Sequence, residues 1–319
     1  MTLERFAVAC QFFPPESNGP ANRLGIVADR LAAAVDTHVC TVEPSYPVAC
    51  LYEGVEVARL DECIAPDVDR LPAFRAHGGV VSRALREFFL SRALVRRAAK
   101  VQPTVLWVSV PSMFLIPTSV AWGERAGVPV VVDVRDLTWL YASDSAAFQR
   151  FPRAQLATFL TRWMTESLRK AEIILVTNQG AAEVLVEAGV DADRLLALPN
   201  GISREKFDQL RSVAESEPGD RERLTVTYCG LVGHNQGMAT LADVAERQPG
   251  MDFTVVGAGP ELEGVRHEVD SRGLRNMRFL GQRPWSEIAE VYRHSDILFA
   301  QLRDQGSLSE SAVPSKIYE

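Results

Sequence analysis

Residues 6–43 read FAVACQFFPPESNGPANRLGIVADRLAAAVDTHVCTVE, and this stretch decides the fold class. The apolar run at 6–13 predicts a buried strand, and the amphipathic segment at 22–35 predicts a helix. A second apolar run at 38–43 predicts the next strand. A strand, a helix and another strand in this order form one βαβ unit, in which the two strands are parallel.

The same alternation continues along the chain. Further strands are predicted at 55–60, 104–110, 129–136 and 172–177, with a short run at 195–201, and helices are predicted at 81–100, 113–126, 151–170 and 178–188. Short, almost wholly apolar strands separated by helices are typical of a parallel sheet that is covered on both faces. Residues 1–206 are therefore predicted to form one doubly wound domain.

A change of composition follows at 207–223, where charges are frequent and apolar residues are few, which predicts a linker. Beyond it, strands are predicted at 224–230, 251–259, 277–281 and 296–302, and helices at 237–247, 260–272 and 284–294. Residues 224–319 thus form a second α/β domain in this prediction. A doubly wound sheet more often has about five or six strands, so we expect the second domain to be incomplete.

Length and composition agree with two domains and exclude several classes of protein. The 319 residues, 47% of them hydrophobic, can bury two cores, and the net charge of −7 argues against nucleic-acid binding. The five cysteines include no CxxC pair and no histidine at metal-ligand spacing, which predicts reduced core cysteines in a cytosolic protein and no metal site. The N-terminus lacks the features of a signal peptide, and no apolar run approaches the ~20 residues of a membrane span.

Two glycine-containing loops invite a ligand interpretation. In PPESNGPANRL, residues 14–24, Asn18 and Gly19 can bring backbone N–H groups to an anion at a helix N-terminus. The alternative is a simple connector in which Asn22 caps the helix. GAGPEL, residues 257–262, has leucine where a dinucleotide motif needs its third glycine, so no nicotinamide or flavin site is predicted.

The segment VVVDVRDLTW at 130–139 places Asp133, Arg135, Asp136 and Trp139 at the end of a predicted parallel strand. Open α/β sheets bind ligands beyond the carboxyl ends of their strands. These residues are therefore candidates for a binding site, and the alternative is an Arg–Asp pair that only holds the loop.

The helix predicted at 81–100 is basic and amphipathic, with six basic residues and two adjacent phenylalanines. Basic residues beside exposed aromatic rings suit an anionic membrane surface. The alternative is that Leu85, Phe89 and Leu94 are buried in the domain while the arginines are solvated.

The last stretch, SESAVPSKIYE at 309–319, predicts a phosphate site. Pro314 ends an extended loop, and Ser315 is expected to cap a helix that begins near Lys316. The first N–H groups of such a helix can bind a diphosphate, and a carboxylate on its first turn can accept both hydroxyls of a ribose. A capped loop without a ligand is the alternative, although a cap alone does not need the flanking Glu310.

Taken together, the motifs resemble family-4 glycosyltransferases of the GT-B architecture, particularly the bacterial branch that assembles polysaccharide and O-antigen repeats. The matching segments span nearly the whole chain in order: FFPPESNGPANRL, VRDLTW, LALPNGISREKF, YCGLVGHNQGM, VVGAGPELEGV, NMRFLGQRP and AVPSKIYE. The resemblance implies an α/β fold of two Rossmann-like doubly wound domains that face a cleft. The acceptor-binding domain would be 1–206, the linker 207–223, and a partial nucleotide-sugar-binding domain 224–319.

The resemblance also implies a reaction. A hexosyltransferase of this kind moves a sugar from a nucleotide-diphosphate sugar to a lipid-linked or polysaccharide acceptor, retains the anomeric configuration, and uses no metal or other cofactor. Such enzymes take part in cell-envelope glycan synthesis. The implied location is the cytoplasm or the inner face of the cell membrane, with 81–100 as the membrane contact.

Roles for individual residues follow from the same resemblance. Glu310, beside the donor sugar, and Asp136, near the acceptor, are the expected catalytic residues, whereas Glu319 would hold the ribose. The loops at 257–259 and 280–283 would flank the base. The residues expected to bind the donor are Gly19, Gly233, His234, Arg303, Val313, Ser315, Lys316 and Glu319.

The chain departs from the family pattern in three places. Many relatives carry an arginine and a lysine in the loop after the first strand of the second domain, but here the lysine-like position is Gln236 and the nearest candidate cation is His234. VRDLTW lacks the histidine that many relatives place near the acceptor, and Asp136 is its expected substitute. We also expect the chain to end inside its donor motif at Glu319 and to have weak or no transferase activity as given.

Two alternative functions remain open from the sequence. One is a non-catalytic sugar-nucleotide-binding or partner-binding protein on the same fold, and the other is a GT-B-like sugar-nucleotide epimerase. The expected partners are a nucleotide-sugar donor and a glycan or lipid-linked acceptor, and nucleic acid is not among them.

Overall fold

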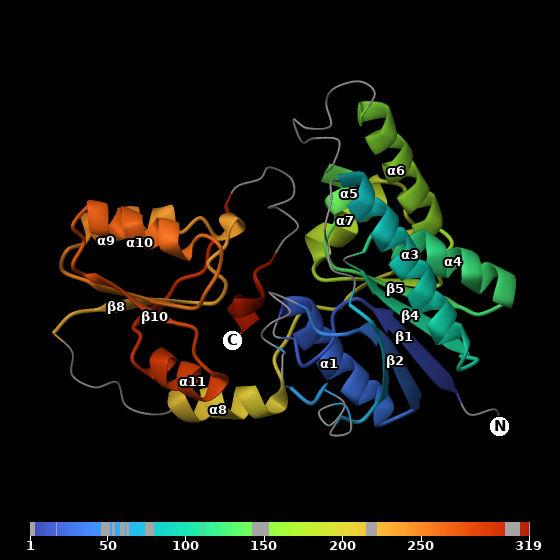
Figure 1. Ribbon diagram of the computed structural model, residues 1–319, viewed down its shortest axis with the longest axis horizontal. Helices are drawn as coiled ribbons and strands as arrows, with labels where there is room; N and C mark the ends of the chain where they lie inside the picture. Colours follow the sequence, from blue (N-terminus) through green and yellow to red (C-terminus); the bar gives the residue numbers. More distant parts are fainter. Residues whose placement is uncertain are drawn as a thin grey trace. The chain divides into compact units, whose positions relative to one another are not determined.

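The computed structural model describes residues 4–16, 18–45, 52, 55–57, 61, 64–73, 80–110, 112–141, 153–214, 222–303 and 313–318. These residues form two compact units, each with its own sheet (Figure 1). Unit 1 is Met1–Asn200, and unit 2 comprises Gly201–Ser309 and Val313–Glu319. The break at position 200 precedes the predicted domain end at 206.

Unit 1 is built on a seven-stranded sheet in which every pair of neighbouring strands is parallel. The strands are β1 (Arg5–Cys10), β2 (Asp36–Val42), β3 (Asp67–Leu71), β4 (Val105–Val110), β5 (Val130–Val134), β6 (Ile173–Val176) and β7 (Leu195–Ala197). Their spatial order is β3-β2-β1-β4-β5-β6-β7, so the direction of winding reverses between β1 and β4. This is the order of a doubly wound dinucleotide-type sheet, as the sequence predicted.

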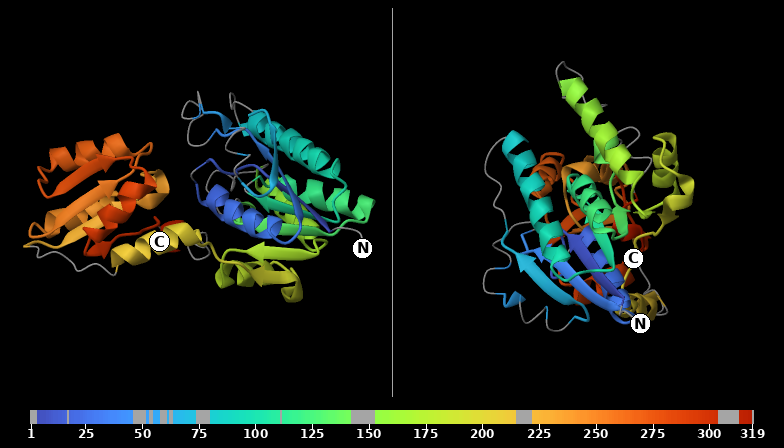
Figure 2. Two further views of the ribbon diagram at one scale, coloured as in Figure 1. Left: turned by 90° about the horizontal axis from the view of Figure 1, so that it is seen from below. Right: turned by 90° about the vertical axis from the view of Figure 1, so that its right-hand side faces the viewer.

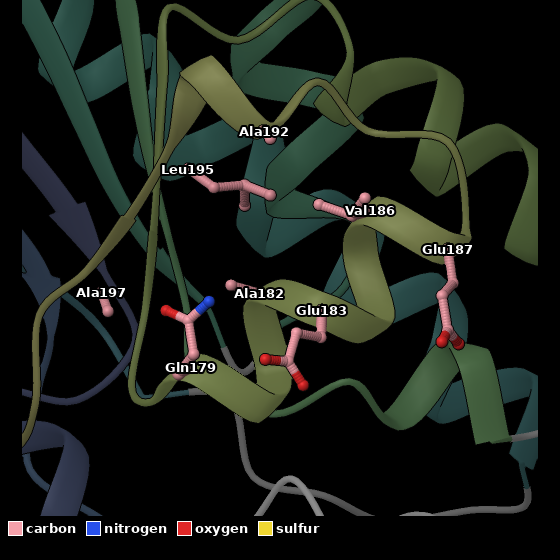
Figure 3. Close-up of a pocket in the computed structure, with 8 residues that line it drawn as sticks. All are labelled: Gln179, Ala182, Glu183, Val186, Glu187, Ala192, Leu195 and Ala197. Atoms are coloured by element: carbon pink, nitrogen blue, oxygen red, sulfur yellow. The ribbon is translucent and has the colours of Figure 1, made fainter.

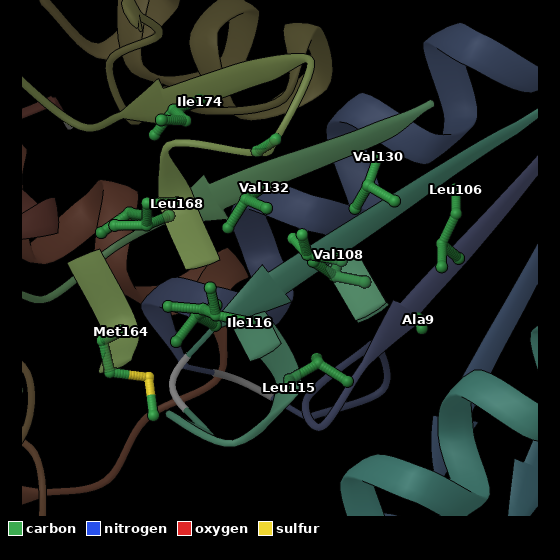
Figure 4. Packing of buried hydrophobic residues seen from close by; sticks show 14 of the residues in the cluster. Ala9, Leu106, Val108, Leu115, Ile116, Val130, Val132, Met164, Leu168 and Ile174 are labelled. Carbon is green, nitrogen blue, oxygen red and sulfur yellow. The ribbon is translucent and has the colours of Figure 1, made fainter. Parts of the chain in front are cut away.

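Helices cover both faces of this sheet. They are α1 (Gly19–Ala32), α3 (Val80–Ala99), α4 (Leu115–Ala126), α5 (Thr138–Tyr141), α6 (Arg153–Leu168) and α7 (Gln179–Glu187). The larger core lies between the sheet and α3, α4, α6 and α7, and Leu94 of α3 is fully buried there. Ile116 and Leu168 belong to the same core (Figure 4). On the opposite face, Leu24 and Ala28 of α1 join a smaller core. The central strands are thus buried on both faces, which explains their continuous apolar sequence.

Helix α1 begins earlier than predicted, and Asn22 is not its cap. The N-cap is Asn18, whose side-chain oxygen accepts a hydrogen bond of 2.8 Å from the Ala21 N–H. Pro20 stands in the first turn, where its missing N–H would have no partner within the helix. Asn18 and Pro20 together therefore set the start of α1.

The third strand of unit 1 lies at Asp67–Leu71 and not at 55–60, where we expected it. Of the expected stretch the structure describes 55–57, and these residues form no strand. The observed strand carries several charges, among them Asp69 and Arg70, which form ion pairs with side chains of other segments. Such charges hide the apolar pattern of an edge strand, because its outer side meets water.

Unit 2 holds a four-stranded sheet, again with parallel pairs throughout. Its strands are β8 (Thr225–Cys229), β9 (Asp252–Val256), β10 (Met277–Gly281) and β11 (Ile297–Leu298), and its helices are α8 (Arg204–Ala214), α9 (Ala239–Arg247), α10 (Leu262–Ser271) and α11 (Trp285–Arg293). The strand order is β10-β9-β8-β11, so the winding reverses between β8 and β11. Helices α9 and α10 lie on one face, with Leu241 and Phe253 in the core, and α11 and α8 lie on the other (Figure 1).

Helix α8 occupies the first part of the segment 207–223, where a linker was expected. It packs against α11, because Trp285 Nε1 donates a hydrogen bond to Gln209 Oε1 (2.6 Å) and the Lys206 ammonium lies 4.4 Å from the centre of the Trp285 ring. No residue of α8 is fully buried. The high charge of this segment therefore belongs to a solvent-exposed helix and not, over its first part, to an extended connector.

Candidate functional site

The carboxyl edge of the sheet in unit 2 gathers several residues with a predicted donor role. The winding reverses between β8 and β11, and the segments that follow these strands are 230–238 and 299–303. They are joined there by a hydrogen bond of 2.7 Å from the Arg303 N–H to the Asn235 carbonyl. Ligands of open α/β sheets bind at such a reversal. Gly233, His234 and Arg303 thus lie where a ligand is expected.

Glycines let the loops at this edge approach each other closely. A Cβ atom at Gly257 would lie 1.8 Å from the Gly230 carbonyl oxygen, and one at Gly259 would lie 2.2 Å from the Val232 carbonyl oxygen. Gly257 also has φ +141°, a backbone conformation that other residues rarely adopt. Hydrogen bonds from Gly230 to Val256 (2.8 Å) and from Val232 to Ala258 (3.0 Å) hold the two loops together. The result is a tightly joined backbone surface beside the predicted donor residues.

Lys316 lies against the same loop. Its ammonium is 3.7 Å from the centre of the Tyr228 ring, a close cation–π contact. A Cβ atom at Gly230 would lie 3.0 Å from Lys316 Nζ, so the missing side chain at this position leaves room for the lysine. Burial raises the pKa of Tyr228 above its ordinary value, and its hydroxyl donates a hydrogen bond to the Leu231 carbonyl. The tyrosine is therefore neutral, and its ring is a support for the cation.

Arg303 and His234 form a second polar group on the loop. Arg303 Nη1 and His234 Nε2 are 3.3 Å apart, and because a guanidinium only donates hydrogen bonds, the imidazole nitrogen is the acceptor in this contact. The other ring nitrogen, Nδ1, lies 3.9 Å from the Glu261 carboxylate. Gln236, at the lysine-like position, accepts a hydrogen bond of 3.2 Å from the Gly233 N–H. Arg303 is thus the permanent cation here, and Gln236 stabilises the turn.

The segment that carries Lys316 forms a single short turn. Ser315–Tyr318 is a 3₁₀ helix, and the Ile317 N–H donates a hydrogen bond of 3.1 Å to the Pro314 carbonyl. The prediction that Ser315 caps a helix starting near Lys316 is therefore wrong in detail, because Ser315 is itself the first residue of the turn. Val313, just before it, is 37% exposed.

The structure leaves three other predicted donor residues untested. Glu310 and Glu319 lie outside the described residues, so their roles stay predictions. Gly19 is the first residue of α1 in unit 1. Among the first three amides of that helix, Pro20 has no N–H and the Ala21 N–H is bonded to the cap. The first turn of α1 thus offers an anion fewer donors than the sequence suggested.

In unit 1, Asp133 belongs to a buried ion pair. Arg23 of α1 donates to its Oδ1 over 3.0 Å, and the exposed fractions of the two side chains are 3% and 0%. The same guanidinium donates to the carbonyls of Leu198 and Pro199, and Ser109 donates to the other carboxylate oxygen (2.9 Å). The predicted alternative of an Arg–Asp pair thus applies to Asp133, with α1 supplying its partner. We call this cluster the α1 clamp.

Arg135 and Asp136 follow β5 at the carboxyl edge of the same sheet. Arg135 Nη2 lies 3.5 Å from Asn200 Oδ1, and its Nη1 is buried with no hydrogen-bond partner among the described residues. Burial lowers the pKa of Arg135, while Asp133 opposes this shift. Desolvation by the surrounding protein raises the pKa of Asp136, partly offset by Arg135, although more than a third of the residue stays accessible. A reachable carboxyl group with a raised pKa suits an acid–base role.

A groove of about 420 Å³ lies elsewhere, between α7 and β7 at the edge of the sheet in unit 1 (Figure 3). Its lining includes Gln179, Glu183, Glu187 and Leu195 and contains no basic residue. Two carboxylates in the wall would repel a diphosphate. This groove therefore does not match a nucleotide-sugar site.

The sequence analysis missed two elements of these sites. Tyr228 was assigned only to a strand, and Arg23 only to a helix. Arg23 stands next to the apolar stripe of α1, so its side chain is directed toward the core. An arginine is rarely buried without an ion-pair partner, and this position was therefore a signal for a buried acidic residue. The Lys316–Tyr228 contact had no sequence signal, since it joins segments far apart in the chain.

The remaining sequence expectations concern cysteines, metals and membrane spans. Cys10, Cys40 and Cys229 are free and buried, whereas the other two cysteines lie outside the described residues. Among the residues that the structure describes, no group of three or more His, Cys, Asp or Glu side chains can hold a metal ion. None of the described helices has the length and apolar character needed to cross a bilayer.

Comparison with known proteins places these sites in context. The family model for a glycosyl transferase 4-like domain matches residues 18–201. The Escherichia coli strain K12 protein named "Putative colanic acid biosynthesis glycosyl transferase WcaI" is 23% identical over 329 residues, and the alignment covers 96% of this chain and 78% of that protein.

Two solved structures illustrate the shared fold. Anabaena Alr3699/HepE in complex with UDP and glucose has a TM-score of 0.60 and 15% identity, over 93% of this chain and 73% of its own. The UDP-GlcNAc 2-epimerase of Neisseria meningitidis bound to UDP-GlcNAc has a TM-score of 0.52 and 10% identity, over 92% of this chain and 76% of its own. At these identities the likeness is one of fold, and it does not by itself separate a transferase from an epimerase.

Proposed function

The chain belongs to the glycosyl transferase 4-like family, and from that premise we propose that it moves a hexosyl group from a nucleotide-diphosphate sugar to a lipid-linked or polysaccharide acceptor with retention of anomeric configuration. Its fold is the GT-B glycosyltransferase fold, with two Rossmann-like units. In this proposal unit 2 binds the donor and unit 1 binds the acceptor.

The observation that carries the donor assignment is the position of Lys316 against Gly230 at the winding reversal of the sheet in unit 2. When the sugar leaves, negative charge grows on the diphosphate, and groups that are already oriented toward it lower the barrier most. Lys316 and Arg303 supply permanent positive charge at this edge. The backbone N–H groups of Val313, Ser315 and Lys316 would add further donors, in keeping with their predicted role.

This arrangement accounts for the departure at Gln236. Because Gln236 is bonded to the Gly233 N–H, it supports the loop and supplies no charge. We propose that Lys316 takes over the electrostatic role that many relatives give to a lysine in this loop. No metal is needed in this scheme, because Lys316 and Arg303 would both supply positive charge to the leaving group.

The acceptor side of the proposal is supported by Asp136. Its raised pKa and its place at the carboxyl edge of the sheet in unit 1 suit a group that takes up or orients the acceptor proton. The similarity to WcaI, a protein named for colanic acid biosynthesis, supports polysaccharide synthesis as the setting. We place the reaction in the cytoplasm or on the inner face of the cell membrane.

Calorimetry tests the donor assignment. The chain is titrated with UDP-, GDP- and ADP-sugars and then compared with Lys316→Ala and with a matched control, Lys206→Ala. The control removes another ammonium that stacks on an aromatic ring in unit 2. One donor should bind, and Lys316→Ala should weaken it roughly 10- to 100-fold, the value of a charged hydrogen bond, whereas Lys206→Ala should not.

Equal effects of the two lysine variants would refute the role of Lys316. Release of free sugar epimer from the donor, without transfer to an added membrane extract, would favour the epimerase alternative. Binding without turnover would favour the non-catalytic binding protein. The anomeric configuration of any product, read by NMR, tests retention directly.

A further inference from the structure

Helix α3 exposes an apolar and basic stripe. Leu85, Phe89, Arg92 and Arg96 recur at the spacing of one helix face, and all four are exposed, Leu85 at 54% and Phe89 at 60%. The opposite face of α3 faces the core. Of the three residues that the alternative interpretation buries, Leu94 is buried as stated, whereas Leu85 and Phe89 are exposed. Two large apolar side chains exposed on one helix face mark a candidate interaction site.

A row of aromatic rings extends this stripe to α6. Successive ring centres lie 5.8 Å (Phe89 to Phe88), 5.9 Å (Phe88 to Phe114), 6.1 Å (Phe114 to Trp163) and 6.4 Å (Trp163 to Phe159) apart. Phe159, at the far end, is 63% exposed. Figure 2 shows α3 and α6 on the two sides of α4, and α4 contacts both helices. The row of ring contacts thus connects the exposed Phe89 of α3 with the exposed Phe159 of α6.

Positive charge accompanies the rings. Arg92 lies 5.6 Å from the centre of the Phe88 ring, and Arg96 on α3 and Arg162 on α6 are exposed. Helix α3 carries five arginines and one glutamate, in a chain whose net charge is −7. On α6 the carboxylate of Glu166 is bonded to Arg169 (3.1 Å). The local charge is therefore opposite in sign to that of the whole chain.

We propose that this surface, made of Leu85, Phe89, Arg92, Arg96, Phe159 and Arg162, docks on an anionic lipid bilayer. Phenylalanine and leucine side chains can enter the boundary between headgroups and acyl chains while arginines meet the lipid phosphates. A second copy of the chain fits less well, because a twofold contact would bring the arginines together. Nucleic acid fits less well, because the chain as a whole carries a net charge of −7.

Such docking specifies the surface behind the proposed location at the membrane, and it does not depend on the transfer reaction. It would hold unit 1 at the surface where a lipid-linked acceptor resides. It also assigns the contact to α3 and α6 together, since the aromatic row joins both helices, and not to 81–100 alone.

Vesicle sedimentation tests the docking surface with the whole chain. Vesicles of phosphatidylcholine alone are compared with vesicles of phosphatidylcholine and phosphatidylglycerol. The chain should sediment with the anionic vesicles, less so at high salt, and little with the neutral ones. Arg92→Gln with Arg96→Gln should reduce partitioning about fivefold for each arginine. Phe89→Ser with Phe159→Ser should reduce it at least about tenfold.

Phe207→Ser is the matched control, because Phe207 is 47% exposed, lies under an arginine (Arg204, 5.8 Å) and belongs to unit 2. It should leave partitioning unchanged. Equal sedimentation with neutral and anionic vesicles would overturn the proposal, as would an equal loss in Phe207→Ser and in the double variant Phe89→Ser with Phe159→Ser. So would a dimer in solution that Phe89→Ser dissociates while lipid binding is absent. Circular dichroism of each variant should match the wild type, since all the altered side chains are exposed.

Discussion

Replacement of Arg23 by methionine should open the centre of unit 1. The change removes the positive member of the α1 clamp and leaves the Asp133 carboxylate buried without its ion-pair partner, while the carbonyls of Leu198 and Pro199 lose a donor. Breaking a buried pair by removing one partner costs about 3–5 kcal/mol. The side chains are only 3% and 0% exposed, so solvent cannot compensate for the loss.

Hydrogen exchange followed by mass spectrometry is the assay, because it reports local opening peptide by peptide. A cost of about 3–5 kcal/mol corresponds to exchange that is roughly a hundred- to several-thousand-fold faster in peptides from β4, β5 and α1. Lys170→Met is the control, since Lys170 pairs with Glu124 at the surface, where their side chains are 54% and 48% exposed. Such a pair contributes about 0–1 kcal/mol.

The double variant Arg23→Met with Asp133→Leu should recover part of the protection. An apolar pair can replace a buried ion pair at little cost, but the two carbonyls remain without their donor. If Arg23→Met changes the exchange of β5 no more than Lys170→Met does, the clamp does not stabilise unit 1 and the argument from burial fails.

Three further changes have defined outcomes. Gly257→Ala should lower the free energy of unfolding in urea by about 2–5 kcal/mol, because the new Cβ overlaps the Gly230 carbonyl and φ is positive. Gly264→Ala should raise it by about 0.5–1 kcal/mol, because no atom lies near a Cβ at that helical position. Equal effects of the two changes would contradict the close approach of the loops. Burial raises the pKa of Cys10 and Cys40 to about 12 from an ordinary 9.0. The folded chain therefore keeps protons that the unfolded chain loses, and the free energy of unfolding should fall as the pH rises from about 9 to 12. The fall should be less steep in the double variant Cys10→Ala with Cys40→Ala. Asn18→Ala should cost about 1 kcal/mol in thermal unfolding and Asn18→Asp little, since aspartate also caps; no difference between them would argue against the cap.

The alternation of apolar strands with amphipathic helices was sufficient to predict the doubly wound sheet of unit 1, and the resemblance of seven ordered motifs indicated the family. The alternation failed at β3, because charges paired at a sheet edge remove the apolar pattern, and at the linker, because an exposed helix such as α8 has the composition of a connector. The alternative interpretation of 14–24 as a connector placed the N-cap at Asn22, because two asparagines stand near the start of α1 and only the geometry distinguishes them.

The candidate donor site was predictable in part. The loop after β8 and the segment around Lys316 could be proposed as ligand-binding from their motifs. Their mutual contacts could not, because the place of Lys316 depends on the missing side chain at Gly230 and on the ring of Tyr228. The contact in which Arg303 is the donor and His234 the acceptor likewise follows from a distance that no sequence pattern contains.

The contact between α8 and α11 has a spectroscopic consequence. Trp285 is one of five tryptophans in the chain, and the other four, Trp107, Trp122, Trp139 and Trp163, belong to unit 1. A Trp285→Phe chain would therefore emit tryptophan fluorescence from unit 1 alone. The difference between its spectrum and that of the parent chain isolates the emission of the single indole beside Lys206 and Gln209, so light can follow each unit separately during unfolding.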